Sequence, residues 1–302
     1  MRAPGYRIAP LAIVLAIVAV LLALADGCGS GSDDGGTTDP KPSPPAVRSD
    51  ASQRVVVWAV GDGADGDREA RRVARLIERD RPDRFLYLGD VYPEGTAEKF
   101  AENYDTVYGG LAERTAPTPG NHEWFNHAEG YDPYWKKKHG RKPHPYYSFR
   151  TGGWQIISLN SEAEHGSQSP QAAWLRSQVR GGGTCRLAFW HRPRYSAGER
   201  HGDQPDVQPF WDALKGRAAV VVNGHEHDMQ RFAPRDGITE LVSGAGGADL
   251  YAVDKQYKGL AFGNDDEFGA LRLELSPGTA TYRFVTSQGG TIDSGKVACK
   301  PG

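Results

Sequence analysis

The sequence predicts an α/β fold, a four-layer sandwich of two mixed β-sheets flanked by helices. Two patterns support this prediction. From residue 54 onward, short apolar strand patterns alternate with amphipathic helix patterns, and beyond residue 238 the chain turns to β-rich sequence. A chain of 302 residues, 38% of them hydrophobic, is long enough to bury one substantial core. We therefore expect a single folded domain over residues 53–302.

The first 28 residues have the pattern of a targeting segment. Arg2 and Arg7 precede an apolar run over residues 11–25, which is shorter than the roughly 20 residues that cross a membrane and suits a signal peptide. The residues that end at Cys28 resemble the lipobox of bacterial lipoproteins, although Ala25 and Asp26 depart from its usual pattern. Either Cys28 is lipidated, or the segment directs soluble secretion or remains as an uncleaved anchor.

Residues 29–52 are predicted to be a flexible linker. The segment is rich in Gly, Ser, Asp, Thr and Pro, cannot bury a core and behaves as a tether. A tether favours lipidation, because it lets a folded domain stand away from a membrane. We therefore expect an exported protein of the cell envelope, either lipid-anchored or secreted.

The remaining two cysteines are expected to pair. Cys185 and Cys299 form an even count once Cys28 is set aside, and an exported chain reaches an oxidising compartment. We predict a disulfide between them that fixes the C-terminal strand. The alternative is two buried free thiols.

The elements of the folded part follow from periodicity and turn residues. Strands are expected at 55–60 and 85–88, and helices at 68–79 and 97–104. A hairpin is expected from 146–150 and 154–159, and Ser169 followed by Pro170 opens a helix that runs to residue 179. Further on, the patterns predict a strand at 186–190, a helix at 206–214, and strands at 218–222, 270–275 and 279–285.

Polar clusters follow several of these apolar stretches or lie in a Pro-Gly turn. They are Asp62, Asp90, Asn121 with His122, His191, and the run from Asn223 to His227. Ligands of open α/β sheets bind outside the carboxyl ends of the strands, so these side chains are expected to converge on one crevice. Carboxylates, imidazoles and an amide oxygen suit zinc, manganese or iron, and no set of thiolates indicates a structural zinc site.

The order of these clusters resembles the calcineurin-like metallophosphoesterases, and within them the purple acid phosphatase branch. The matching blocks are Gly61-Asp62, Gly89-Asp90, Gly120-Asn121-His122-Glu123, His191, and Gly224-His225-Glu226-His227. Each block alone is weak, but all of them in this order are a strong signal. The resemblance implies the calcineurin-like phosphoesterase fold and a two-metal-dependent hydrolase of phosphate esters.

The resemblance also implies a ligand set for two metal ions, which are Fe, Mn or Zn. Asp90 would bridge both ions, with Asp62 and His227 on the first. The ligands of the second would be Asn121, His191 and His225. His122 would be a catalytic residue over the site that acts on the leaving oxygen, while the two ions activate a shared water for attack on phosphorus.

One departure from the family concerns the first metal. Most members place a His two positions after the first Asp, where this chain has Ala64. The purple acid phosphatase branch has instead a Tyr three positions after the bridging Asp, whereas Tyr92 stands only two positions after Asp90. Either Tyr92 ligates the first metal, or Asp65, Asp67 or a water completes the shell and Tyr92 packs under the loop.

Other residues are weaker site candidates. His201 follows His191 by a short loop and is either a catalytic residue that reaches the phosphate or a solvated loop histidine. Glu123 and Arg192 flank predicted site residues, and we expect them to orient ligands by hydrogen bonds. The aromatic and basic segment 124–142 is either a rim that selects substrates or an insertion packed by its own aromatics.

The favoured function is hydrolysis of phosphomonoesters outside the cytoplasm. The alternatives are a phosphodiesterase or nucleotidase with the same dinuclear site and, less favoured, a lipoprotein that binds metal or phosphate without turnover. The formal net charge of −2 gives no indication of a nucleic-acid partner. The expected partners are a small phosphate-ester substrate and, through the N-terminal segment, a membrane; the protein is expected to be a monomer.

Overall fold

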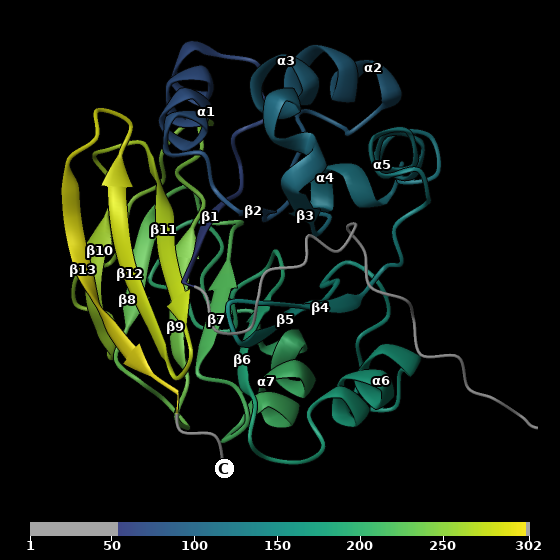
Figure 1. Cartoon of the computed structure of the whole chain (residues 1–302). Coiled ribbons are helices and arrows are strands. Elements are labelled where there is room, and N and C mark those ends of the chain that lie inside the picture. The colour runs from purple at the N-terminus through teal and green to yellow at the C-terminus, as the bar shows by residue number, and fades with distance from the viewer. Residues whose placement is uncertain (1–53, 300–302) are drawn as a thin grey trace, which may run out of the picture. The chain divides into compact units, whose positions relative to one another are not determined.

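Two β-sheets form the centre of the domain. The computed structural model describes residues 54–299, so the predicted signal peptide and the whole of the predicted linker lie outside the described residues. The first sheet has six strands in the order β13-β12-β11-β1-β2-β3, and the second has seven in the order β10-β8-β9-β7-β6-β5-β4 (Figure 1). Both sheets are mixed, with parallel pairing at β1-β2-β3 and at β5-β6-β7-β9.

The strands of the first sheet are β1 Val55–Val60, β2 Arg84–Tyr87, β3 Thr115–Pro117, β11 Gly269–Ser276, β12 Thr279–Thr286 and β13 Thr291–Ala298. Those of the second are β4 Tyr147–Thr151, β5 Trp154–Ser158, β6 Cys185–Phe189, β7 Val220–Asn223, β8 Met229–Phe232, β9 Thr239–Ser243 and β10 Leu260–Asn264. The helices are α1 Arg68–Asp80, α2 Ala97–Lys99, α3 Asp105–Tyr108, α4 Asn121–Trp124, α5 Tyr131–His139, α6 Pro170–Gln178 and α7 Gln208–Leu214. A π-helical turn, η1 Phe100–Tyr104, joins α2 to α3, and the 3-10 helices are η2 Gly109–Arg114 and η3 Pro205–Val207.

The two sheets pack face to face over one apolar core. Successive side chains of a strand point to opposite faces, so β1 sends Val57 and Ala59 to the inner core and Trp58 to the outer face. Leu187 and Phe189 of β6 meet them from the second sheet. The inner core therefore holds the sheets together and fixes the position of the strand ends.

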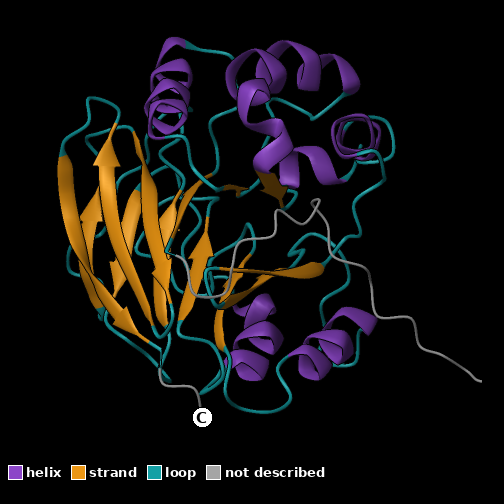
Figure 2. Ribbon diagram, in the orientation of Figure 1, coloured by secondary structure: helices purple, strands orange, loops and turns teal. Residues whose placement is uncertain are grey.

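Helices cover the outer face of each sheet, which gives the predicted four layers (Figure 2). The buried side of α1 packs with Trp58 of β1 on the first sheet, and α6 and α7 pack with Trp190, beyond β6, on the second. Helix α1 forms because Asp67 caps its first turn by accepting from Ala70 N and because Ala70, Val73 and Ile77 share one buried face. The predicted fold class is confirmed.

The predicted disulfide is confirmed as well. Cys185 at the start of β6 is bonded to Cys299, the residue after β13, across a sequence separation of 114. It therefore ties the end of the first sheet to the beginning of a central strand of the second.

Most predicted elements are present with boundaries shifted by one or two residues. The predicted helix at 97–104 is longer than expected, because it passes through the π-helical turn and ends at Tyr108. The predicted helix at 206–214 begins with a 3-10 turn, and its α-helical part starts at Gln208. Among residues 54–299, no helix is both long enough and apolar enough to span a membrane.

Candidate metal centre

The predicted site residues gather at one edge shared by the two sheets. Asp62, Asp90 and Asn121 follow β1, β2 and β3 of the first sheet, while His191 follows β6 and His225 follows β7 of the second. The strands β1, β2 and β3 are parallel, as are β6 and β7, so their carboxyl ends lie together. Each sheet thus contributes part of the cluster.

One group of donors surrounds the hydroxyl of Tyr92. This oxygen lies 3.3 Å from Asp62 Oδ1, 3.3 Å from Asp90 Oδ2 and 2.8 Å from His227 Nε2. His227 Nε2 is also 3.7 Å from Asp62 Oδ1. Tyr92 therefore reaches the predicted first-metal ligands although it stands one position closer to Asp90 than the family pattern places it.

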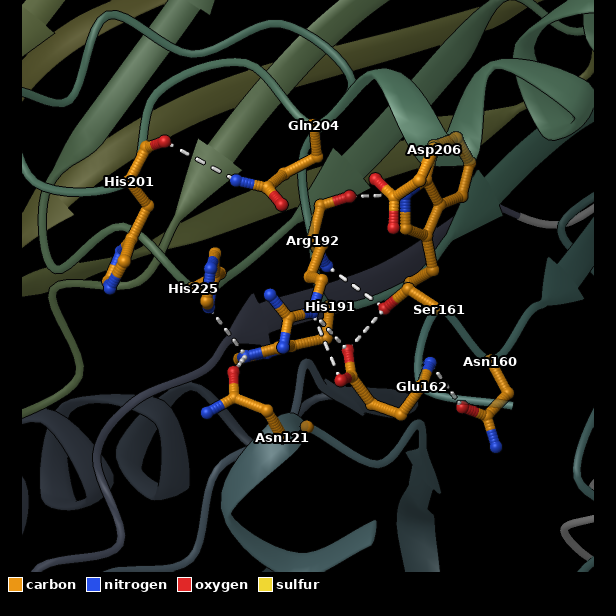
Figure 3. Close-up of polar contacts among 12 residues, drawn as sticks. Asn121, Asn160, Ser161, Glu162, His191, Arg192, His201, Gln204, Asp206 and His225 are labelled. Carbon is orange, nitrogen blue, oxygen red and sulfur yellow. Dashed lines mark hydrogen bonds and ion pairs between the residues drawn. The ribbon is translucent and has the colours of Figure 1, made fainter. Parts of the chain in front are cut away.

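The second group surrounds Nε2 of His191 and includes the other oxygen of Asp90. His191 Nε2 lies 3.4 Å from Asp90 Oδ1. It also lies 3.1 Å from Asn121 Oδ1 and 3.1 Å from His225 Nδ1 (Figure 3). Donor atoms of Asp90, His191 and His225 all lie within 4.8 Å of one another. Asp90 is common to both groups.

The histidines are oriented so that a ring nitrogen faces the cluster. Nδ1 of His191 donates to Leu88 O at 2.8 Å, and Nδ1 of His227 donates to Asp249 O at 2.7 Å. A neutral ring that donates through Nδ1 keeps a lone pair on Nε2, the atom that faces the cluster. His225 Nε2 is buried without a hydrogen-bond partner among the described residues. This donor set fits metal cations.

The electrostatics of the cluster agree with that fit. Burial lowers the pKa of His225 well below its ordinary value and the pKa of His227 to about 4, so both rings are neutral and free to donate a lone pair at neutral pH. Burial also lowers the pKa of His191, but the charge of Asp90 outweighs it and the pKa is raised. The carboxylate of Asp90 thus favours positive charge beside it, as the binding of a cation requires.

The two other predicted catalytic residues lie at the margin of the cluster. His122 donates its backbone N–H to Asp90 Oδ1 at 3.1 Å, and its Nε2 is 3.8 Å from Asp90 Oδ2. The ring of His201 stacks on His225 with centroids 4.1 Å apart, and its Nδ1 lies 3.5 Å from Glu226 Oε2. Both side chains are partly exposed, at 36% and 30%, so each can reach a bound molecule.

Two buried carboxylates hold the loops of the site. Glu123 accepts from the backbone N–H groups of Asp90, Val91 and Gly120 at 2.9–3.1 Å, as its predicted orienting role requires. Glu226 accepts from Ser196 Oγ and from Gly202 N and so fixes the loop of His201. Sequence reasoning missed this role of Glu226, whose only signal was its place between two predicted ligands.

Some sequence alternatives take other positions. Asp67, considered as a substitute ligand, caps helix α1 instead, and Asp65 accepts from Asp67 N. Tyr251 was not predicted, but its ring stacks on His227 with centroids 3.8 Å apart. The segment 124–142 contains helix α5, whose Tyr131 and Trp135 are buried against the aromatic rings of η1.

The fold and the clustered donors define a metal-dependent phosphoesterase. The family model for calcineurin-like phosphoesterases matches residues 55–229, and the chain belongs to that family. Within it, the chain is similar to the purple acid phosphatases. It is 24% identical to tartrate-resistant acid phosphatase type 5 of Mus musculus over 270 residues, which cover 74% of this chain and 81% of the relative.

A plant relative also belongs with these phosphatases, and two solved structures share the fold. The chain is 27% identical to probable purple acid phosphatase 20 of Arabidopsis thaliana over 213 residues, 62% of this chain and 49% of the relative. The fold matches purple acid phosphatase PPD1 from yellow lupin seeds (Lupinus luteus) with a TM-score of 0.67, 16% identity, and coverage of 82% and 54%. It also matches GAP50, the anchor in the inner membrane complex of Plasmodium, with a TM-score of 0.68, 17% identity, and coverage of 82% and 89%.

Proposed function

We propose that this chain is a phosphomonoesterase with a dinuclear metal centre that acts outside the cytoplasm. The observation that carries the proposal is the convergence of two donor groups on Asp90, in a chain of the phosphoesterase family. Both curated relatives are named as acid phosphatases, which favours monoesters over the alternatives of a phosphodiesterase or a nucleotidase.

The proposed ligands divide between two metal ions, Fe, Mn or Zn. Asp62, Tyr92 and His227 would hold the first ion, and Asn121, His191 and His225 the second, with Asp90 shared. Two ions bound here would neutralise charge on the phosphoryl oxygens and lower the pKa of the attacking water. A phenolate is a hard, charge-donating ligand, so the place of Tyr92 favours iron in the first position.

The protein groups around the ligands have separate tasks in this proposal. His122, tied to Pro93 O through Nδ1 at 2.6 Å, presents Nε2 on the Asp90 side of the site and would donate a proton to the leaving oxygen. His201, fixed by its stacking on His225, would donate to the substrate phosphate. Glu123 and Glu226 keep the two loops in place, so little movement is needed when a phosphate ester binds.

Turnover measurements with defined metals test the function. The purified protein is loaded separately with manganese, zinc and iron, and hydrolysis of a chromogenic phosphomonoester is compared with that of the matching diester. We expect faster monoester hydrolysis and a visible charge-transfer band for the iron form, and Tyr92→Phe should lose the band. Diester preference would favour the phosphodiesterase alternative. No turnover with any metal would favour a protein that only binds metal or phosphate.

Two substitutions separate metal binding from catalysis. Asp90→Ala should abolish metal loading and turnover together, because Asp90 is common to both donor groups. His122→Ala should keep its metal and lose about 10²- to 10⁴-fold in kcat, the usual contribution of a general acid. Metal content is measured beside the rate. An Asp90→Ala protein with full metal and full activity would contradict the dinuclear assignment.

Action outside the cytoplasm rests on the N-terminal segment and the disulfide. Disulfides persist in oxidising compartments, and Cys185 and Cys299 are paired. Cell fractionation with wild type and Cys28→Ala tests the anchor. Lipidation predicts that the wild type is in the membrane fraction and that the variant is not retained there, whereas a cytoplasmic wild type would contradict export.

A further inference from the structure

Arg192 stands directly after a predicted ligand, His191, and is held more firmly than a surface arginine. Its backbone N–H donates to Ser161 Oγ at 3.1 Å, and its carbonyl accepts from Trp190 Nε1 at 2.6 Å. Its Nε donates to both oxygens of Glu162, at 2.9 and 3.0 Å. The position of the guanidinium is therefore fixed before any substrate binds.

The carboxylate that holds Arg192 is itself fixed. Glu162 is only 8% exposed, and its Oε1 accepts from Ser161 Oγ at 2.9 Å. Its backbone N–H donates to Asn160 Oδ1, and buried Gln171 pairs with the backbone N–H and carbonyl of Asn160. Several buried polar groups thus serve to place one carboxylate beside one arginine, a degree of support that is typical of functional sites.

The outer part of the guanidinium is not used by this support. The two η nitrogens of Arg192 make no hydrogen bond or ion pair with the residues described, 54–299, and the side chain is 27% exposed. Arg186 is different, because its η nitrogens donate to backbone carbonyls of Thr184, Arg217 and Gly181. Arg186 has the bonding of a structural arginine, whereas Arg192 keeps donors free.

Those free donors face the candidate metal centre. In Figure 3 the guanidinium projects toward the space around Asn121, His191 and His225. His191, the residue directly before Arg192, has its Nε2 3.1 Å from Asn121 Oδ1 and 3.1 Å from His225 Nδ1. Arg192 is therefore close enough to act on an anion bound between these groups.

We propose that Arg192 is a further catalytic residue, whose η nitrogens donate to a terminal oxygen of the bound phosphate and favour dianionic monoesters over diesters, with Glu162 as its positioning residue. This proposal rests on the proposed function. A phosphomonoester offers three terminal oxygens and nearly two negative charges at neutral pH. A diester offers two terminal oxygens and about one negative charge. A fixed guanidinium is suited to the additional oxygen and charge.

The test compares Arg192→Ala with Arg231→Ala in the metal-loaded full chain. Arg231 is a matched control, because it also pairs through Nε with a carboxylate, Asp293, at similar exposure, and its guanidinium lies over the Tyr282 ring. For each protein, kcat/KM is measured with a monoester and its diester, the binding of inorganic phosphate by calorimetry, and the metal content by elemental analysis.

Arg192→Ala should lower kcat/KM for the monoester by about 10- to 100-fold, the loss expected for hydrogen bonds to a charged group. The diester should lose less than about 5-fold, phosphate binding should weaken about 10-fold or more, and metal content should stay the same. Arg192→Lys should recover part of the loss. Glu162→Gln should lose less than Arg192→Ala, and adding it to Arg192→Ala should cause no further loss, since Glu162 acts through Arg192.

Equal phosphate binding by wild type and Arg192→Ala would overturn the proposal, as would equal losses for both esters. A wild type that hydrolyses neither ester but binds phosphate through Arg192 would refute the proposed function and still support this contact. A metal-loaded wild type that binds no phosphate would overturn the contact itself.

Discussion

Several predicted ligands adopt a backbone conformation that side chains rarely take. Asp62, Asp90 and His225 have φ values of 59°, 69° and 72°, and each directly follows a glycine. A non-glycine residue in the left-handed region costs on the order of 1–3 kcal/mol, so such residues persist where the surrounding structure holds them. Here the turn after each strand directs the side chain into the cluster, and the inner core supplies the stability that offsets the strain.

Gly120 is the residue whose small size the site most clearly requires. A Cβ at this position would lie 2.0 Å from Asp90 Oδ1 and 2.6 Å from Asp90 N. Gly120→Ala should therefore displace Asp90, reduce metal content and lower turnover by about 100-fold or more. Gly166→Ala is the control, because a Cβ there would meet nothing within 4 Å. A Gly120→Ala protein with wild-type metal content and rate would show that Asp90 tolerates the displacement.

At the scale of single residues, the sequence predicts which side chains converge on the site better than it predicts which groups orient those side chains. The motif order correctly brings Asp90, His191 and His225 together, since each motif follows a strand. The reach of Tyr92 stayed open, because a shift of one position depends on the path of the loop. Partners such as Leu88 O and Asp249 O are backbone atoms, and residue identities carry no signal for them.

Among the elements, several strands of the core were predictable as apolar runs, whereas β3 and β13 at sheet edges have no such pattern. β1, β6 and β7 are nearly or fully buried and read as apolar runs. β3 has only three residues and ends in a proline, and β13 at the sheet edge alternates between exposed and partly exposed residues. Neither has the composition of an apolar strand, so pairing with a neighbour decides its structure.

Strand β9 contributes a buried carboxyl group that makes stability depend on pH. Glu240 accepts from Arg194 N at 2.9 Å and from Tyr195 N at 3.4 Å, while its Oε2 has no partner among the described residues. Burial raises the pKa of Glu240 from its ordinary 4.5 to about 8, although the backbone donors and Arg194 lower it and Asp203 raises it. Between these values the folded protein binds a proton that the unfolded chain releases.

The unfolding free energy should therefore fall as pH rises from 4.5 toward 8, by up to about 1.4 kcal/mol per pH unit from this group. Glu240→Gln removes the ionisation, so its stability relative to wild type should increase between pH 5 and pH 8. Denaturant unfolding of both proteins at the two pH values measures the difference. The same difference at both values would mean that Glu240 is ionised in the folded protein or titrates normally.

For the whole molecule, the fold class was predictable because two patterns agree, alternating strands and helices first and paired strands later.

The bonded cysteines lie at the amino end of β6, whereas His191 follows its carboxyl end. Stability and chemistry are thus supported at opposite ends of one central strand, and substitutions at the two ends should have separate effects.

Removing the disulfide tests this separation. Cys185→Ala with Cys299→Ala should lower the unfolding free energy by about 2–4 kcal/mol, because the unfolded chain regains freedom, and leave turnover at low temperature close to wild type. Denaturant unfolding with and without reductant measures the first effect, and only the wild type should respond to the reductant. A double variant as stable as the oxidised wild type would show that the bond adds nothing to the fold.

The division of the donor groups between the sheets has a thermodynamic consequence. Asp62 and Asp90 belong to the first sheet, and His191, His225 and His227 to the second. A cation held by groups from both sheets cross-links the two halves of the sandwich, and the unfolded chain cannot offer the same site. Metal binding would then be coupled to folding. At a free metal concentration about 1,000-fold above Kd, binding would add about 4 kcal/mol to the unfolding free energy. Metal supply would then set the stability of the folded protein as well as its rate of hydrolysis.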